Sequence, residues 1–525
     1  MKIGSDIVKV YKDVHIWVGI VCGLMLFIAF YAGAITMFEK PLERWATPPS
    51  ALSEAPPLED AEKLLAAVLE KHPEAARRYS IVIDPTPDQP ARLIWAERGK
   101  GPRELIEYGA SFAPDGSLQT ERLRKAKAAE LVDRMHQFVG LPLPDDIARI
   151  LMGAVALAYA VALLSGLIVL LPTLVKDAFA LRIGKNLKRM WLDAHNALGI
   201  FSLPFHLVIA LTSVVFAFHT PFYATQAKAL YGGEIDWGEH EAAPRGQAPL
   251  PASELLKRAN LQLPGFEVYG FGFQTQKDGN VGATITGLDL RRGTRARTYM
   301  FTHLDPYSGA VDVHDLPGRM DGWSEAVNAF FALHFGSFGG NPVRWLYLLM
   351  GLAGAALFYT GNLLWIESRR KKQRGAETVA QKRSAKVLGC LTVGIALGSV
   401  AGISATIAAA KWLPVRVQDL GFWHEAIYYA VFFASVGWTF ARGAARGAID
   451  LLWIGALLTL AIPLASLAGI WNIGGAWNHS GGWPVDLTAL LAAPVFLLIA
   501  HHTRRRMREG HADSVWSAAG AARSG

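Results

Sequence analysis

Four histidines occupy matching positions in two similar stretches of sequence. Residues 13–20 (DVHIWVGI) and 193–200 (DAHNALGI) share Asp, His, Gly and Ile at an offset of 180 positions, which places His15 and His195 on two apolar segments. His136 and His334 are 198 positions apart, and the segments that follow them share a Pro and a Leu-Met-Gly triplet at that same offset. A repeated metal-ligating side chain at the ends of membrane segments predicts a paired cofactor site.

Haem is the cofactor that this set of histidines favours. Imidazole is a good axial ligand of haem iron, and two facing imidazoles give a six-coordinate iron suited to electron transfer. The two cysteines are isolated in apolar stretches, so no Cys-x-x-Cys-His motif is present for covalent attachment. We therefore predict two haems of the b type, an inner one held by His15 with His195 and an outer one held by His136 with His334.

A glycine follows each histidine of the inner pair by one helical turn. These are Gly19 and Gly199, and the missing side chain would let a flat macrocycle approach the helix. Aromatic residues are expected to form the apolar walls of the site, namely Trp17 and the segments 201–205 and 330–335.

The role of His206 stays open at this stage. It lies near the middle of a predicted span, where an ionisable group is costly and usually functional. It could be a ligand of the outer haem, a proton-handling group or a satisfied polar residue of the bundle core. Three other histidines of the membrane segments are expected to be boundary residues, namely His219, His501 and His502. His424 and His479 would both face the outer side and could pair as a third metal site, which is the weaker alternative.

The composition is that of a polytopic membrane protein. Of 525 residues, 52% are hydrophobic and only 18% are charged. Eight apolar runs are long enough to cross a hydrocarbon core of roughly 30 Å. They lie at about 14–38, 147–172, 194–219, 343–366, 385–411, 421–442, 448–472 and 484–503.

The charge pattern predicts the orientation. The net charge of +8 comes from basic clusters just outside apolar runs, at 176–188, 369–372 and 504–508, which is typical of cytoplasmic loops and not of a nucleic-acid-binding surface. We expect a multi-pass protein of the bacterial inner membrane with both termini in the cytoplasm. The first apolar run lacks a cleavage motif and is interpreted as an uncleaved anchor.

Two long polar insertions would then face the periplasm. Each contains a helical stretch, 60–72 or 252–262, followed by alternating segments and a turn signal, so each predicts a small α+β module. A short apolar helix that ends in His and Gly precedes the next span in both cases. The predicted fold is a duplicated four-helix haem-binding core carrying these two modules, followed by a four-helix extension. The expected boundaries are 1–40, 41–135, 136–219, 220–325, 326–372 and 373–525.

Motifs for a bound electron donor are missing from the sequence. There is no Gly-x-Gly-x-x-Gly at a strand-to-helix turn, no Walker loop, and no cytoplasmic segment long enough for a flavin domain. Electrons would have to come from a separate cytoplasmic reductase or from a membrane quinol.

The sequence resembles the PepSY-associated transmembrane helix family, in particular its iron-regulated inner-membrane proteins and siderophore-iron reductases. The resemblance rests on residues 15–19 (HIWVG), 191–199 (WLDAHNALG), 203–212 (LPFHLVIALT) and 334–340 (HFGSFGG). It covers about residues 10–370, and the two insertions look like the PepSY domains of that family.

The resemblance implies a dihaem core that passes electrons from the cytoplasmic face to a periplasmic ferric siderophore, which releases its iron as ferrous ion. Two other functions remain open. The first is a non-catalytic module whose PepSY domains bind a periplasmic partner. The second is a siderophore or metal transporter, although the last four predicted spans contain no cluster of acidic residues.

Overall fold

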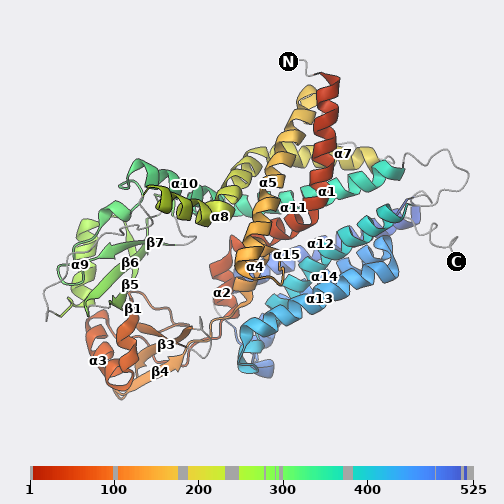
Figure 1. Cartoon of the computed structure of the whole chain (residues 1–525). Coiled ribbons are helices and arrows are strands. Elements are labelled where there is room, and N and C mark those ends of the chain that lie inside the picture. Colours follow the sequence, from red (N-terminus) through yellow and green to blue (C-terminus); the bar gives the residue numbers. More distant parts are fainter. Residues whose placement is uncertain are drawn as a thin grey trace, which may run out of the picture. The chain divides into compact units, whose positions relative to one another are not determined.

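The computed structural model describes residues 4–98, 105–174, 187–230, 248–276, 279–289, 291–294, 299–370, 382–478, 481–509 and 514–516. Most of the predicted basic loop at 176–188 and His479 lie outside these residues. The chain divides into two compact units (Figure 1). The first, a helical unit, comprises Met1–Thr47, Ala126–Thr220 and Trp345–Gly525, and the second comprises Pro48–Lys125 and Pro221–Arg344.

The chain is a polytopic α-helical membrane protein. Six helices of the described residues are long and apolar enough to cross a membrane. They are α1 (Ser5–Thr36), α5 (Asp145–Leu170), α11 (Gly340–Arg370), α12 (Arg383–Ala409), α14 (Ala444–Ile470) and α15 (Trp483–Glu509).

The eight predicted spans are not confirmed. The third predicted span is two helices, α7 (Leu187–Phe201) and α8 (Leu203–Leu230), which bend by 70° at their junction. Pro204 lies at this bend and has no N–H to donate to the preceding turn. The sixth predicted span is a helix, α13 (Leu420–Arg442), but its polar and aromatic residues leave it outside the apolar set.

Four helices of the first unit share a buried apolar cluster. Phe30 of α1 packs in a T-shaped contact against Phe358 of α11, with ring centroids 5.1 Å apart. The cluster also draws on α5 and α8, and its buried members are Cys22, Leu26, Phe30, Val155, Tyr159, Ala210 and Ala355. These helices correspond to the predicted four-helix core.

The C-terminal helices α12 to α15 pack through small residues. Gly394, Gly398 and Gly402 recur every four residues on α12, so they lie on one face. A Cβ atom at each of them would come within 3.0 Å of an atom of α13. Such close approach of backbones is the usual way in which membrane helices gain packing energy.

The second unit is built on one antiparallel sheet. Within the described residues it has seven strands in the order β4-β3-β2-β1-β5-β6-β7. The first insertion supplies β1 (Arg78–Val82), β2 (Leu93–Arg98), β3 (Leu105–Phe112) and β4 (Leu118–Arg122). The second supplies β5 (Glu267–Thr275), β6 (Val281–Leu288) and β7 (Met300–Leu304).

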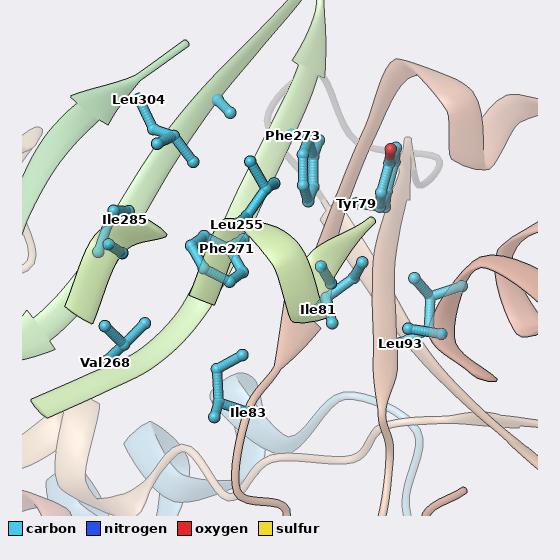
Figure 2. Packing of buried hydrophobic residues seen from close by; sticks show 14 of the residues in the cluster. Tyr79, Ile81, Ile83, Leu93, Leu255, Val268, Phe271, Phe273, Ile285 and Leu304 are labelled. Atoms are coloured by element: carbon cyan, nitrogen blue, oxygen red, sulfur yellow. The ribbon is translucent and has the colours of Figure 1, made fainter. Parts of the chain in front are cut away.

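The two insertions therefore form a single sheet, whereas the sequence predicted two small modules. β1 pairs with β5 in a register that includes Tyr79 opposite Phe273. This pairing covers the backbone edge that each module would otherwise expose. The helices α3 (Ala61–Lys71) and α9 (Ala252–Gln262) pack against one shared core, whose centre is shown in Figure 2.

The shared core predicts that the two insertions unfold together. Phe271 on β5 is fully buried, and its replacement by alanine should destabilise the sheet by about 3–5 kcal/mol. In the Phe271→Ala variant, hydrogen exchange should quicken in β1 and β2 as much as in β5 and β6. Phe301 on β7 is 48% exposed, so Phe301→Ala is the matched control and should leave exchange nearly unchanged. Faster exchange confined to the second insertion would contradict the prediction.

Candidate functional site

Two of the predicted ligands meet inside the first unit. His15 on α1 and His195 on α7 have ring centroids 6.1 Å apart, with planes inclined by 70°. A metal–imidazole bond is about 2 Å long, so two rings on opposite sides of one ion have centroids roughly 6 Å apart. The spacing of these two side chains therefore fits a pair of axial ligands.

Each of these rings is oriented by a backbone carbonyl of another helix. The Nδ1 atom of His15 lies 2.8 Å from the carbonyl oxygen of Ala162 on α5, and that of His195 lies 3.1 Å from the carbonyl oxygen of Leu357 on α11. A carbonyl can only accept, so Nδ1 carries the proton and the lone pair is on Nε2. A donated Nδ1–H is the usual second-shell contact of a metal-bound histidine.

A glycine makes room for each ring. Gly166 and Gly361 lie one helical turn after the two carbonyls. A Cβ atom at Gly166 would come within 2.8 Å of His15 Cε1, and one at Gly361 within 3.3 Å of His195 Cε1. Each ring thus occupies the space that a side chain on the facing helix would fill.

A hydroxyl completes the arrangement on both sides. The Ser165 hydroxyl lies 2.7 Å from the carbonyl oxygen of Val161 and 3.0 Å from that of Ala162, and Thr360 donates to the Leu357 carbonyl at 3.0 Å. A Ser-Gly and a Thr-Gly pair thus stand in the same relation to the two histidines. These residues were missed in the sequence analysis, although the two dipeptides on apolar spans were the signal that could have revealed them.

His136 makes the same type of contact with α1. It lies on α4 (Ala128–Phe138), and its Nδ1 atom is 2.8 Å from the carbonyl oxygen of Ala29. Gly33 follows that carbonyl by one turn, and a Cβ atom there would come within 2.6 Å of His136 Nδ1. Among the described residues of the first unit, the arrangement of carbonyl, glycine and imidazole therefore occurs at His15, His195 and His136.

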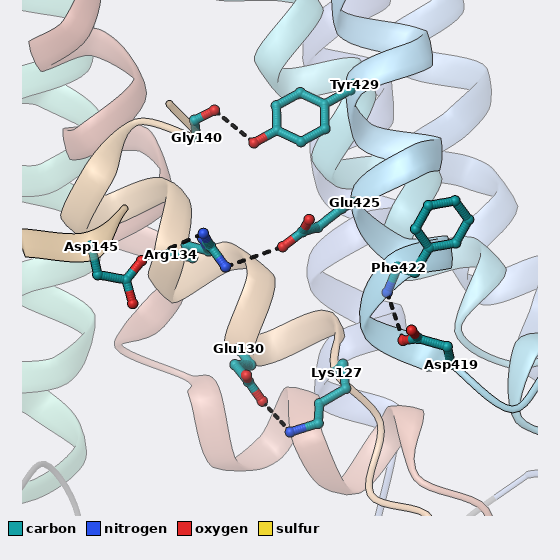
Figure 3. A network of polar contacts seen from close by, with 9 residues as sticks. All are labelled: Lys127, Glu130, Arg134, Gly140, Asp145, Asp419, Phe422, Glu425 and Tyr429. Carbon is teal, nitrogen blue, oxygen red and sulfur yellow. Dashed lines mark hydrogen bonds and ion pairs between the residues drawn. The ribbon is translucent and has the colours of Figure 1, made fainter. Parts of the chain in front are cut away.

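Contacts with the C-terminal helices hold α4 in place (Figure 3). Arg134 lies 3.2 Å from Glu425 of α13 and 3.5 Å from Asp145 at the start of α5. The Tyr429 hydroxyl donates to the carbonyl oxygen of Gly140 at 2.7 Å. Exposed ion pairs stabilise little individually, but together these contacts set the position of the helix that carries His136.

His206 on α8 is buried in an aromatic environment. It has no exposed surface, and its ring centroid lies 5.5 Å from that of Phe30. The Tyr159 hydroxyl lies 2.5 Å from His206 Nδ1 and also donates to the His206 carbonyl at 3.3 Å. When the hydroxyl donates to the carbonyl, its oxygen accepts Nδ1–H and the lone pair of the ring is on Nε2, whereas a hydroxyl that donates to Nδ1 places the proton on Nε2. Within the described residues this Nε2 is buried without a hydrogen-bond partner, as expected of a metal ligand.

The histidines lie at two levels along α1. His136 contacts Ala29 and His206 contacts Phe30, which is the next residue of α1. His15 precedes Ala29 by 14 positions, which corresponds to about 21 Å along a helix. The first unit therefore presents the pair of His15 and His195 at one level of α1, and two further imidazoles, those of His136 and His206, at the level of residues 29–30.

His334 belongs to the second unit. It lies on α10 (Gly322–Phe335), next to Phe335 with ring centroids 5.6 Å apart. Its predicted pairing with His136 stays a prediction.

The structure also places the two glycines that were predicted to make room for a macrocycle and the aromatic residues that were predicted to line the site. A Cβ atom at Gly19 would meet nothing within 4 Å, and one at Gly199 would make only an ordinary contact of 3.7 Å. Phe205 lies 5.8 Å from the ring of His206. Trp17 and Phe201 are 61% and 68% exposed, and the expectation that they line the site stays a prediction.

The remaining histidines are scattered. His219 contacts the carbonyl of Phe216 in its own helix. His501 and His502 are exposed at the end of α15. His424 is fully buried on α13, and both of its ring nitrogens lack a hydrogen-bond partner within the described part of the chain.

These features define a multi-pass membrane protein with a cluster of oriented imidazoles in its first helices. The family model of the PepSY-associated TM region matches residues 13–368, about two thirds of the chain. The protein therefore belongs to the PepSY-associated TM family. The matched region begins two residues before His15 and ends within α11, so helices α12 to α15 lie outside it. No curated protein matches the chain.

Proposed function

We propose that the protein is an inner-membrane dihaem b oxidoreductase that passes electrons from the cytoplasmic side to periplasmic ferric-siderophore iron. The pair formed by His15 and His195 is the observation that carries this proposal. Two helices from distant parts of the sequence bring two imidazoles to the separation that a shared iron requires. Both rings have an Nδ1–H hydrogen bond that leaves Nε2 available for iron.

The fit of the residues to haem b supports two sites in a duplicated core. His15 and His195 would hold the inner group, and Gly19 and Gly199 leave space on the same helices. His136 would hold the outer group, with His334 or His206 as its partner. Haem b, when bound by two histidines, supplies reversible one-electron transfer.

The chain's own residues hold the ligands and exclude water. The carbonyls of Ala162 and Leu357 fix the tautomer and direction of the inner imidazoles. Cys22 and Leu26 of the buried apolar cluster lie on α1 between the two levels and fill that part of the helix bundle with apolar side chains. A low-polarity surrounding of this kind, together with the ligand set, is what tunes the potential of a haem.

The substrate side of the proposal rests on chemistry and on the family resemblance. Siderophores hold ferric iron far better than ferrous iron, so adding one electron to the ferric chelate releases its iron. The two insertions, which we place in the periplasm, would lie on the side where the chelate arrives. The electron donor would be a cytoplasmic reductase or a membrane quinol, since the sequence has no flavin or dinucleotide motif.

An optical spectrum of the purified protein tests this function. Protein from haem-replete cells should show reduced-minus-oxidised bands of b-type haem. After anaerobic reduction, a ferric siderophore should reoxidise those bands, and the ferrous product should be trapped by a ferrous-specific chelator. The same siderophore loaded with gallium(III), which is not reduced under these conditions, is the matched control.

A colourless preparation would contradict the haem proposal and favour a non-catalytic membrane module that binds a periplasmic partner. If ferric and gallium siderophores leave the haem bands equally reduced, the proposed electron-transfer core is retained but the ferric siderophore is rejected as its substrate.

A further inference from the structure

Three metal-ligating side chains converge in the second unit, away from the histidines of the membrane helices. The Nδ1 atom of His72 lies 3.5 Å from Glu74 Oε1 and 3.9 Å from Glu97 Oε1. One ligand atom from each residue lies within 4.8 Å of the other two. Within the described residues this is the only such group of three or more His, Cys, Asp and Glu side chains.

The fold brings these residues together from separate elements. His72 is the C-cap residue that follows α3, Glu74 lies in the next 3-10 turn (Pro73–Arg77), and Glu97 lies near the end of β2. Glu97 comes two residues after Trp95, so both side chains point to the sheet face that α3 covers. The Trp95 indole N–H donates to Glu97 Oε1 at 2.9 Å and fixes the direction of that carboxylate.

The local charge favours a cation. Two carboxylates approach each other here, and within the described residues neither forms an ion pair with a lysine or arginine. Like charges at this separation repel unless a proton or a cation lies between them. The C-terminal end of α3 adds the negative end of a helix dipole beside His72.

We propose that His72, Glu74 and Glu97 bind a divalent first-row transition-metal ion of the Fe²⁺, Mn²⁺ or Zn²⁺ class. An imidazole nitrogen together with two carboxylate oxygens suits these ions better than Mg²⁺ or Ca²⁺, which prefer oxygen ligands alone. The side chains are between 24% and 45% exposed, and three protein ligands leave coordination positions open to water. The site is therefore built for an exchangeable ion, and the proposal does not depend on the haem function.

Manganese binding tests the proposal directly. The full chain in detergent, without an affinity tag, is titrated with Mn²⁺ while the EPR signal of the free ion is followed. One ion should bind per chain, and His72→Ala or Glu97→Gln should weaken its binding by about tenfold or more. The Glu97→Gln change preserves an oxygen that can accept the Trp95 hydrogen bond, so it removes the charge without disturbing the fold. Glu70 on the exposed face of α3 provides the control variant Glu70→Gln, which should bind as the unchanged chain does.

Competition identifies the class of ion. Zn²⁺, or Fe²⁺ under anaerobic conditions, should displace the bound Mn²⁺ at a lower concentration than Mg²⁺. The proposal is overturned if the unchanged chain and the His72→Ala variant bind Mn²⁺ equally, or if neither binds it. Displacement by Mg²⁺ as easily as by Zn²⁺ would overturn the assignment to a transition metal. The b-type haem spectrum should be the same in all of these variants. The metal proposal can therefore be overturned without the haem proposal, and the haem proposal without the metal proposal.

Discussion

His15→Ala and His195→Ala should each remove about half of the haem b from the purified protein, and the double variant should remove no more than either single one. The two rings lie 6.1 Å apart and under our proposal they would hold one haem b, which would have no covalent link to retain it after one ligand is lost. The second haem, held at the level of residues 29–30, should remain. Ferric-siderophore reduction should fall with the inner haem, because the electron path across the membrane would be interrupted.

Haem per chain, measured from the reduced absorption band, decides this prediction. His501→Ala is the matched control, since His501 is an exposed histidine at the end of a membrane helix and should leave the haem content unchanged. Gel filtration and circular dichroism of each variant show whether the fold is retained. Losses that add up in the double variant would mean that the two histidines serve different haems, and no loss in either would remove both from the list of ligands.

Non-additivity is the informative part of this experiment. Residues that act on one bound group give a double variant no worse than a single one, whereas residues of independent sites give losses that add. His136→Ala in the same background distinguishes the two levels, because His136 contacts α1 at Ala29 and not near His15. Its combination with His15→Ala should therefore remove nearly all of the haem.

Much of the fold was predictable because it depends on local patterns. Long apolar runs gave α1, α5 and α12, and the helical stretch at 252–262 is α9 (Ala252–Gln262). The bend between α7 and α8 and the weak apolarity of α13 were missed, since each depends on a few residues within a hydrophobic run. The union of both insertions in one sheet was also missed. It depends on β1 pairing with β5, and these strands are almost 190 residues apart in a sequence that carries no record of the pairing.

The candidate site was predictable in its residue types but not in its geometry. Matching spacings revealed His15 and His195, and the structure brings their rings together. The groups that orient them are backbone carbonyls, and a carbonyl acceptor leaves no trace in the amino-acid type of Ala162 or Leu357. Tyr159 was missed for a related reason, since a tyrosine in an apolar span is ordinarily a packing residue and only its contact with His206 reveals its role.

Replacing the glycines that face the imidazoles by alanine should lower haem binding. The effect should be largest where the added Cβ atom would lie nearest the histidine ring. A Cβ atom at Gly33 would come within 2.6 Å of His136, and one at Gly166 within 2.8 Å of His15. Separations below 3.0 Å require the ring to move, which breaks its hydrogen bond to the carbonyl one turn earlier. Gly33→Ala should therefore affect the outer haem and Gly166→Ala the inner one. Gly361→Ala should have a smaller effect, because its Cβ would lie 3.3 Å from His195.

Haem content and the midpoint potential of each haem measure these effects, since second-shell contacts of a ligand tune both. Gly437→Ala is the control, because a Cβ atom there would meet nothing within 4 Å. In a helix interior, alanine is more favourable than glycine by about 1 kcal/mol, so the backbone of each variant should be at least as stable as before. Loss of haem from Gly166→Ala with an unchanged or raised unfolding temperature would then have to come from the displaced ring. Equal haem content in Gly166→Ala and Gly437→Ala would show that the carbonyl contact does not position His15 for iron.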